Sequence, residues 1–295
     1  MPATIIAGRP IADQIKREVK EGTEELNRTR GIRPGLAFII VGDNPASQSY
    51  VRSKGKACAE MGFHSVTEAL PADCTQERLL DMVRQFNADP AIHGLLVQLP
   101  LPRHIDEQKV IEAIDYRKDV DGFHPVNVGR LVIGLPCLRP CTPAGVQELL
   151  MRSGHDPAGK HVVIVGRSNI VGKPVMNILL QKQRGANAVV TIAHTGGGDM
   201  ARYIREADIL IAAIGKPEAI TGSMLREGCV VIDVGINRIP DPSANSGSRI
   251  VGDVHFASAS LVASAISPVP GGVGLMTIAM LMKNTLLSAA GGLYR

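Results

Sequence analysis

The segment KHVVIVGRSNIVGKP, residues 160–174, decides the fold of the second half of the chain. Its apolar run predicts a buried β-strand that ends at Gly166, and a helix is expected from Val171 or Gly172, with Pro174 in its first turn. A strand, a glycine turn and a helix in this order present backbone N–H groups and the positive end of a helix dipole to a phosphate. The spacing lacks the G-x-G-x-x-G fingerprint, so an ordinary strand–helix unit is the alternative.

Two neighbouring features favour a nucleotide at this turn. Arg167 and Ser168 put a cation and a hydroxyl where a phosphate would lie. The next predicted strand, VVTIAH, ends in His194 and Thr195, and not in the acid that would hydrogen-bond a ribose 2′-OH and reject a 2′-phosphate. We therefore expect NADP as the cofactor. The alternative is that Asp199 folds back and supplies the carboxylate.

Strand and helix patterns alternate on both sides of a Gly- and Pro-rich stretch, GFHPVNVGRLVIGLPCLRPCTPAG (122–145). Before it, GLAFIIVG (35–42), HSVTEALP (64–71) and HGLLVQLPLP (93–102) predict strands separated by helices. After it, the strand of the opening segment is followed by three more apolar runs. Such alternation predicts parallel β-α-β units, so we expect an α/β protein of two domains with the stretch 122–145 as the boundary. The last apolar helix can return to the first domain.

The composition is that of a globular protein and narrows the function classes. The chain of 295 residues is 45% hydrophobic and 20% charged, with a net charge of +4, which suits a small anionic ligand better than a nucleic acid. Its five cysteines lack C-x-x-C spacing and a neighbouring histidine cluster, so we expect reduced thiols and no metal site. The N-terminus does not resemble a signal or transit peptide, and a cytoplasmic protein without a membrane span is expected.

A tyrosine and a lysine, Tyr50 and Lys54, lie four residues apart in SQSYVRSKGKACAEMGF (47–63). This spacing places a phenol and an ammonium on one face of a helix. In a short-chain dehydrogenase the pair follows the nucleotide-binding turn, whereas here it precedes that turn. The simplest alternative is a core tyrosine beside a lysine whose ammonium reaches water. However, we expect Ser47 to cap this helix, which places the pair at the carboxyl end of a strand, where open α/β sheets bind ligands.

Two further polar residues occur in segments of the same half. Gln98 ends the strand of GLLVQLPLP, and Asp121 lies in DYRKDVDGFHP. Either could have a structural role, the amide by bonding a loop and the acid by facing solvent or a helix end. Together with the tyrosine and the lysine they could form one polar site.

These stretches, in this order, resemble the methylenetetrahydrofolate dehydrogenase/methenyltetrahydrofolate cyclohydrolase family, the bifunctional FolD-type enzymes. The resemblance covers nearly the whole chain and is carried by PASQSYVRSKGKACAEMGF, GLLVQLPLP, DYRKDVDGFHPVNVGRL, PCTPAGV, VVIVGRSNIVGKPV, ADILIAAIGKP, VIDVGIN, VGDVHF and SPVPGGVGLMT. It implies a folate-binding catalytic domain of residues 1–140 and 276–295, and a Rossmann NADP-binding domain of residues 141–275. The family is usually a homodimer that pairs through the Rossmann domains.

The resemblance also implies roles for individual residues. Lys54 is the catalytic lysine, Tyr50 faces the substrate ring, Gln98 contacts the lysine and Asp121 anchors the pterin. The implied substrate-binding residues are Ser47, Tyr50, Lys54, Val97, Gln98, Leu99, Asp121, Pro270, Gly271 and Gly272. The implied cofactor-binding residues are Gly166, Arg167, Ser168, Ile170, Gly172, Thr195 and Ile236.

One residue departs from the family pattern. The family usually reads PGGVGPMT, and this chain has Leu275 in place of that proline, which could alter the rigidity of the loop that closes over folate. Two other functions remain open on the sequence. One is a two-domain NAD(P)-dependent dehydrogenase of a small carboxylic acid, and the other is a nucleotide-binding sensor without catalysis. A sensor would be expected to have lost Lys54 or Gln98.

Overall fold

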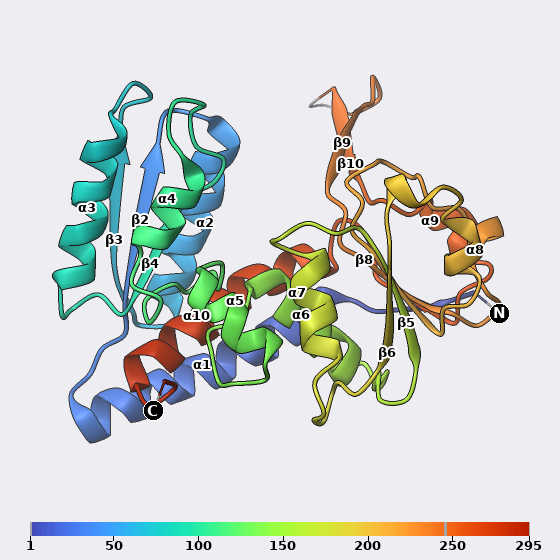
Figure 1. Ribbon diagram of the computed structural model, residues 1–295, viewed down its shortest axis with the longest axis horizontal. Coiled ribbons are helices and arrows are strands. Elements are labelled where there is room, and N and C mark those ends of the chain that lie inside the picture. Colours follow the sequence, from blue (N-terminus) through green and yellow to red (C-terminus); the bar gives the residue numbers. More distant parts are fainter. Residues whose placement is uncertain (1, 245–246, 295) are drawn as a thin grey trace. The chain divides into compact units, whose positions relative to one another are not determined.

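The computed structural model describes residues 2–244 and 247–294, which form two compact units. Residues 14–141 and 278–294 make up one, here called the Lys54 unit, and residues 2–13 and 142–277 make up the other, the Rossmann unit. Each contains a parallel β-sheet with helices packed against it (Figure 1). The predicted α/β fold class is therefore confirmed.

The Lys54 unit is built on a three-stranded parallel sheet in the order β3-β2-β4. Every residue of the central strand is buried, as its uninterrupted apolar sequence predicts for a strand covered on both faces. One face carries Ala37 and Ile39 and packs on α3 and α4. The elements of this unit are α1 (Gly8–Arg30, from residue 14 onward), β2 (Gly35–Val41), α2 (Pro45–Glu60), β3 (His64–Leu70), α3 (Gln76–Ala88), β4 (Gly94–Val97), α4 (Glu107–Ala113), α5 (Pro125–Val132) and α10 (Val273–Ala290, from residue 278 onward).

The Rossmann unit is built on a six-stranded sheet in the order β1-β11-β8-β7-β5-β6, whose neighbouring strands pair in parallel. Helices α8 and α9 lie on one face of this sheet, and α6 and α7 lie on the other (Figure 1). Its elements are β1 (Thr4–Ile5), α6 (Cys141–Arg152), β5 (His161–Val165), α7 (Gly172–Leu179), β6 (Val189–Ala193), η1 (Thr195–Gly197), α8 (Ala201–Ile204), β7 (Ile209–Ala212), η2 (Gly222–Met224), β8 (Val230–Asp233), β9 (Asn237–Pro240), β10 (Ser248–Val251), α9 (Phe256–Ala259) and β11 (Ala265–Ile266).

The N-terminal residues group with the Rossmann unit, although the sequence suggested the first domain. The cause is strand pairing, because β1 pairs in parallel with β11 through Thr4 and Ala265. A two-residue strand is too short to give a periodic signal in the sequence. Residues 278–294 of the C-terminal helix belong to the Lys54 unit.

Two expected loops contain regular structure. The stretch 122–145 includes α5, which begins because the ring of His124 accepts the Val126 N–H and Pro125 occupies the first helical position. The polar stretch 239–250 contributes to an antiparallel hairpin in which β9 pairs with β10, for example Arg238 with Ile250. In both stretches, the many residues typical of turns hide the weaker sequence signals of a short helix and of short strands.

Helix α10 is long and apolar enough to cross a membrane by length and composition alone, with half of the relevant stretch buried inside the protein. Its polar side chains identify it as a core helix. The Asn284 amide donates to the carbonyl oxygens of Val120 at 2.8 Å and Arg139 at 2.9 Å, and the Ser288 hydroxyl donates to that of His93 at 2.6 Å. These bonds fix α10 against the Lys54 unit.

Candidate active site and cofactor-binding turn

The side chain of Lys54 is buried in helix α2, with only 4% of its surface exposed. Its Nζ donates to Oε1 of Gln98 at 3.1 Å and lies 4.5 Å from the centre of the Tyr50 ring. The interpretation of Lys54 as a surface lysine reaching for water is therefore wrong. A buried ammonium beside an amide and an aromatic face requires a polar environment built for it.

The start of helix α2 differs from the expectation. Helix α2 begins at Pro45, and the side chain of Asn44 accepts the N–H of Ser47 at 3.2 Å. Asn44 is thus the N-cap, and Ser47 lies in the first turn. Proline is favoured at the first helical position because its missing N–H has no partner there in any case. The pair of Tyr50 and Lys54 still falls in the first part of the helix.

Gln98 lies directly after β4, at the carboxyl end of the sheet. Its backbone N–H donates to the carbonyl of Ile39 at 2.8 Å, and its Nε2 donates to the carbonyl of Leu99 at 2.6 Å. Because the amide nitrogen is occupied, Oε1 is directed at Lys54. Val97 is buried in β4, and Leu99 is half-buried.

Asp121 supplies the charge that faces the lysine. Burial lowers the pKa of Lys54, and the negative charge of Asp121 opposes that shift. Burial raises the pKa of Asp121, and the positive charge of Lys54 opposes it in turn. Each group therefore favours the charged form of the other, in a region that disfavours both charges.

Two residues that the sequence did not single out support the segment that carries Asp121. The Asn284 amide holds the carbonyl of the preceding Val120 and lies 3.6 Å from Sγ of Cys141. The Cys141 thiol donates to the same carbonyl oxygen at 3.3 Å. A signal for Asn284 was present in the sequence, since an asparagine within an apolar helix usually has a buried partner.

The nucleotide-type turn follows β5 in the Rossmann unit. Gly166 has a φ of +131°, and an added Cβ would lie 2.0 Å from the carbonyl oxygen of Ala213. An added Cβ at Gly172 would lie 2.1 Å from the carbonyl oxygen of Gly166. Only glycine fits at both positions, because the protein's own backbone occupies the place of a side chain. Glycines of this kind are typical of a tight strand–helix turn that binds a pyrophosphate.

The side chains around this turn fit NADP. Ser168 Oγ accepts the Val171 N–H at 3.1 Å and so shapes the turn, while Arg167 is exposed. The Arg167 guanidinium reaches the loop after β6, lying 3.8 Å from an added Cβ at Gly196. Exposed Thr195 is in the same loop. A cation and a hydroxyl in this place suit a 2′-phosphate.

Asp199, the alternative source of a carboxylate, accepts the Ala201 N–H with its Oδ1 at 2.9 Å at the start of α8. The cofactor turn also presents an apolar residue to solvent, since Ile170 is 46% exposed.

The remaining predicted residues lie in the Rossmann unit, away in sequence from Lys54. Ile236 follows β8, is 66% exposed and lies 3.5 Å from an added Cβ at Gly274. Pro270, Gly271 and Gly272 precede α10. The Gly8 N–H donates to the carbonyl of Gly271 at 2.8 Å, which ties this loop to the start of α1. Ile236 and the loop of Pro270, Gly271 and Gly272 therefore both lie next to the start of α10.

Comparison with known proteins agrees with this geometry. Residues 6–121 match the catalytic domain of tetrahydrofolate dehydrogenase/cyclohydrolase, and residues 140–291 match the NAD(P)-binding domain of the same proteins. The chain belongs to this family. A relative named bifunctional protein FolD, from Chlorobium phaeovibrioides, is 56% identical over 286 residues, covering 96% of this chain and 97% of the relative.

Solved structures of family members show the same fold. The bifunctional FolD enzyme of Campylobacter jejuni is 47% identical with a TM-score of 0.91, covering 98% of this chain and 99% of that one. The Trypanosoma brucei enzyme, solved with NADP and an inhibitor, is 43% identical with a TM-score of 0.92 and covers 98% of both chains. The resemblance seen in the sequence is therefore confirmed.

Proposed function

We infer that the chain is a bifunctional folate enzyme. It oxidises 5,10-methylenetetrahydrofolate to 5,10-methenyltetrahydrofolate with NADP, and it hydrolyses the product to 10-formyltetrahydrofolate. Membership of the family supports both activities. The observation that carries the inference is the buried Lys54, held by Gln98 and facing Asp121, in the unit that matches the family's catalytic domain.

Lys54 is suited to the hydrolysis step. Water adds to the methenyl carbon, the bond from that carbon to N5 breaks, and N5 takes up a proton. A lysine at its ordinary pKa of about 10.4 is a poor base at neutral pH. Burial of Lys54 lowers its pKa, which favours the neutral amine that can take a proton of the attacking water. The resulting ammonium then gives its proton to N5, and the hydroxyl on the former methenyl carbon loses its proton to solvent as the formyl C=O forms.

The other three side chains bind and orient the substrate. We assign the Tyr50 ring to the face of the folate ring, where it fixes the position of the reacting carbon. Asp121 accepts the N–H donors of the pterin, and the charge of its carboxylate strengthens those hydrogen bonds. Gln98 Oε1 accepts a hydrogen bond from Lys54 and so holds the amine in one orientation. Ser47, Val97, Leu99 and the loop of Pro270, Gly271 and Gly272 complete the proposed folate contacts.

The Rossmann unit would hold the cofactor, and bound NADP would accept the hydride of the first step. Gly166 and Gly172 admit the pyrophosphate, Arg167 and Thr195 attract the 2′-phosphate, and Ile236 lies on the nicotinamide side. We assign residues 1–140 and 276–295 to folate binding and residues 141–275 to cofactor binding.

A spectrophotometric assay with methylenetetrahydrofolate tests this function. The account predicts reduction of NADP in preference to NAD, with methenyl and then formyl product. Oxidation without hydrolysis would reject the cyclohydrolase activity. Failure of oxidation with either cofactor would reject the dehydrogenase activity and favour a nucleotide sensor.

We further propose a soluble cytoplasmic homodimer that pairs through the Rossmann units. Strand β6 forms one edge of the six-stranded sheet, and Val189 at its start is 64% exposed. Leu180, just after α7, is 48% exposed. An edge strand with exposed apolar residues favours pairing with another chain. Light scattering after gel filtration measures the mass, and a monomer at micromolar concentration would reject the dimer.

A further inference from the structure

Two carboxylates, Asp233 and Asp253, are buried at one end of the Rossmann sheet, with 3% and 0% of their surfaces exposed. Asp233 accepts the N–H groups of Gly235 at 2.9 Å, Asp253 at 3.0 Å and Val254 at 2.9 Å. A buried carboxylate is costly unless hydrogen bonds replace its lost hydration. Here backbone donors supply those bonds, so the position of the chain around each carboxylate is fixed.

The second carboxylate joins two loops that are separate in sequence. Oδ2 of Asp253 accepts the N–H groups of Ile214 at 2.7 Å and Gly215 at 2.9 Å, in the loop after β7. Its Oδ1 accepts the side-chain amide of Asn237 at 2.8 Å, just after β8. Strands β7 and β8 are neighbours, and both loops leave their carboxyl ends. Open parallel sheets bind their ligands at that end.

The packing around the carboxylates requires glycine at two positions. An added Cβ at Gly235 would lie 2.3 Å from Oδ1 of Asp253, and one at Gly252 would lie 1.8 Å from Oδ2 of Asp233. Ile236 lies between Gly235, which bonds Asp233, and Asn237, which bonds Asp253. Hydrogen bonds of the two neighbouring residues therefore fix the chain on both sides of the exposed Ile236.

This arrangement is poorly explained by stability alone. Burial and the nearby negative charge of Asp253 raise the pKa of Asp233 to about 6, so two like charges close together oppose folding at neutral pH. Perturbed acids are retained most often where function needs them. The same backbone could be held at lower electrostatic cost by a neutral acceptor.

We propose that Asp253 is a positioning residue for NADP: it fixes the loop of Ile214 and Gly215 relative to Ile236, so that the nicotinamide end meets a preformed surface. Asp253 does not touch the cofactor and acts through the backbone and Asn237. Asp233 supports it by fixing the chain at Gly235 and at Asp253 itself. This inference rests on the proposed NADP-dependent activity.

The test uses Asp253→Asn in the full chain. The amide group has one acceptor oxygen, so either the two backbone N–H groups or Asn237 loses its partner. We expect the KM for NADP to rise about tenfold or more, the usual loss for a charged hydrogen bond. Hydrolysis of supplied methenyltetrahydrofolate without NADP serves as the internal reference and should stay within about twofold of wild type, since it needs no hydride transfer.

Two further variants separate positioning from folding. The double variant Asp253→Asn, Asn237→Asp exchanges the acid and the amide across the 2.8 Å contact and should recover much of the lost affinity for NADP. Asn237→Ala removes only the side-chain hydrogen bond to Asp253, and it tests the proposal if Asp253→Asn does not fold. It should raise the KM for NADP by a smaller factor.

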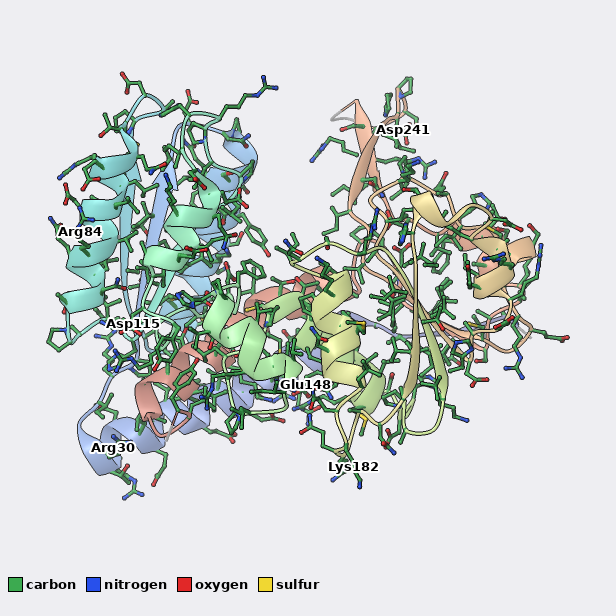
Figure 2. The ribbon with its side chains drawn as sticks, in the orientation of Figure 1. Arg30, Arg84, Asp115, Glu148, Lys182 and Asp241 are labelled. Atoms are coloured by element: carbon green, nitrogen blue, oxygen red, sulfur yellow. The ribbon has the colours of Figure 1, made fainter. Side chains whose placement is uncertain are left out.

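Asp241→Asn is the matched control, an acid in the same unit at the β9–β10 hairpin, bonded to Ser243 at the surface (Figure 2). It should leave both activities unchanged. An unchanged KM for NADP in folded Asp253→Asn and in Asn237→Ala would overturn the proposal. A parallel loss of both activities with a lowered melting temperature would overturn it too, as a purely structural role. If wild type itself fails to oxidise methylenetetrahydrofolate with NADP, the proposed function fails first.

Discussion

Asp253 is buried and Asp121 is half-buried, and their surroundings give them different tasks. Asp121 faces Lys54, a group that can gain or lose a proton. Asp253 receives its hydrogen bonds from backbone N–H groups and an amide, which keep their protons at any ordinary pH. A carboxylate beside a titratable cation can tune chemistry, whereas a carboxylate among fixed donors can only set geometry.

The difference divides the two activities between the two units. In the proposed mechanism, proton transfer in hydrolysis belongs to the Lys54 unit, and hydride transfer depends on how the Rossmann unit presents the cofactor. Substitutions that remove a charge should therefore have different consequences in the two places. The following variants are ordered by the size of the expected effect.

Lys54→Met should have the largest effect, because it removes the titratable group that Asp121 faces and that Asp253 lacks. We expect the rate of hydrolysis to fall about 10²–10⁴-fold, the usual contribution of a general base, while some hydride transfer remains. Separate assays of methenyl and formyl product measure the two steps. Lys56→Met, an exposed lysine on the same helix, is the control. Full hydrolysis in Lys54→Met would refute the role of the lysine.

Asp121→Asn should weaken folate binding about 10–100-fold, because the pterin donors lose a charged acceptor. It should also move the acid limb of the hydrolysis profile to lower pH. The charge of Asp121 raises the pKa of Lys54, so its removal lowers that pKa further and keeps the amine neutral in more acidic solution. Exposed Asp73→Asn is the control. An unchanged folate Kd would reject Asp121 as the anchor.

The buried Asp233 predicts how the stability of the protein changes with pH. Its pKa is raised from 3.8 to about 6, so between these values the folded chain binds more protons than the unfolded chain. The free energy of unfolding should therefore increase as the pH falls through 6. From pH 7 to pH 5 this group should contribute about 1–2 kcal/mol. Urea unfolding of wild type and Asp233→Asn measures it, and equal pH dependence in the two proteins would contradict the assignment.

Leu275→Pro should have the smallest effect. The Leu275 N–H donates to the carbonyl of Gly272 at a long 3.3 Å, in the first turn of α10. Proline costs little in a first turn. We expect a change in stability below about 1 kcal/mol and a KM for folate within about threefold of wild type. A loss of folding would show that leucine is required there.

Much of the fold could be predicted from the sequence because its strands are fully buried. Runs such as GLAFIIV and HVVIV are continuous and apolar, and each is followed by a glycine. Strands β1 and β11 escaped prediction because each has only two residues, and their pairing joins distant parts of the chain. Helix α5 escaped because its cap is a histidine, a residue that sequence patterns rarely treat as one.

The sequence indicated those candidate site residues that lie in recognisable local patterns. Tyr50 and Lys54 share a helix face, and Gln98 and Asp121 each end a recognisable segment. Cys141 and Asp253 act through partners far away in sequence, so neither spacing nor residue type indicates them. An asparagine within an apolar helix indicates a buried partner for Asn284, but it does not say which one. The cap of α2 was placed on Ser47 because Asn44 and Ser47 are both good caps, and Pro45 decides between them.

The division of the two activities is tested most directly by measuring both steps in Lys54→Met and in Asp253→Asn. The account predicts a crossed result: Lys54→Met loses hydrolysis and retains hydride transfer, and Asp253→Asn binds NADP weakly and retains hydrolysis. Parallel loss of both steps in both variants would contradict the account.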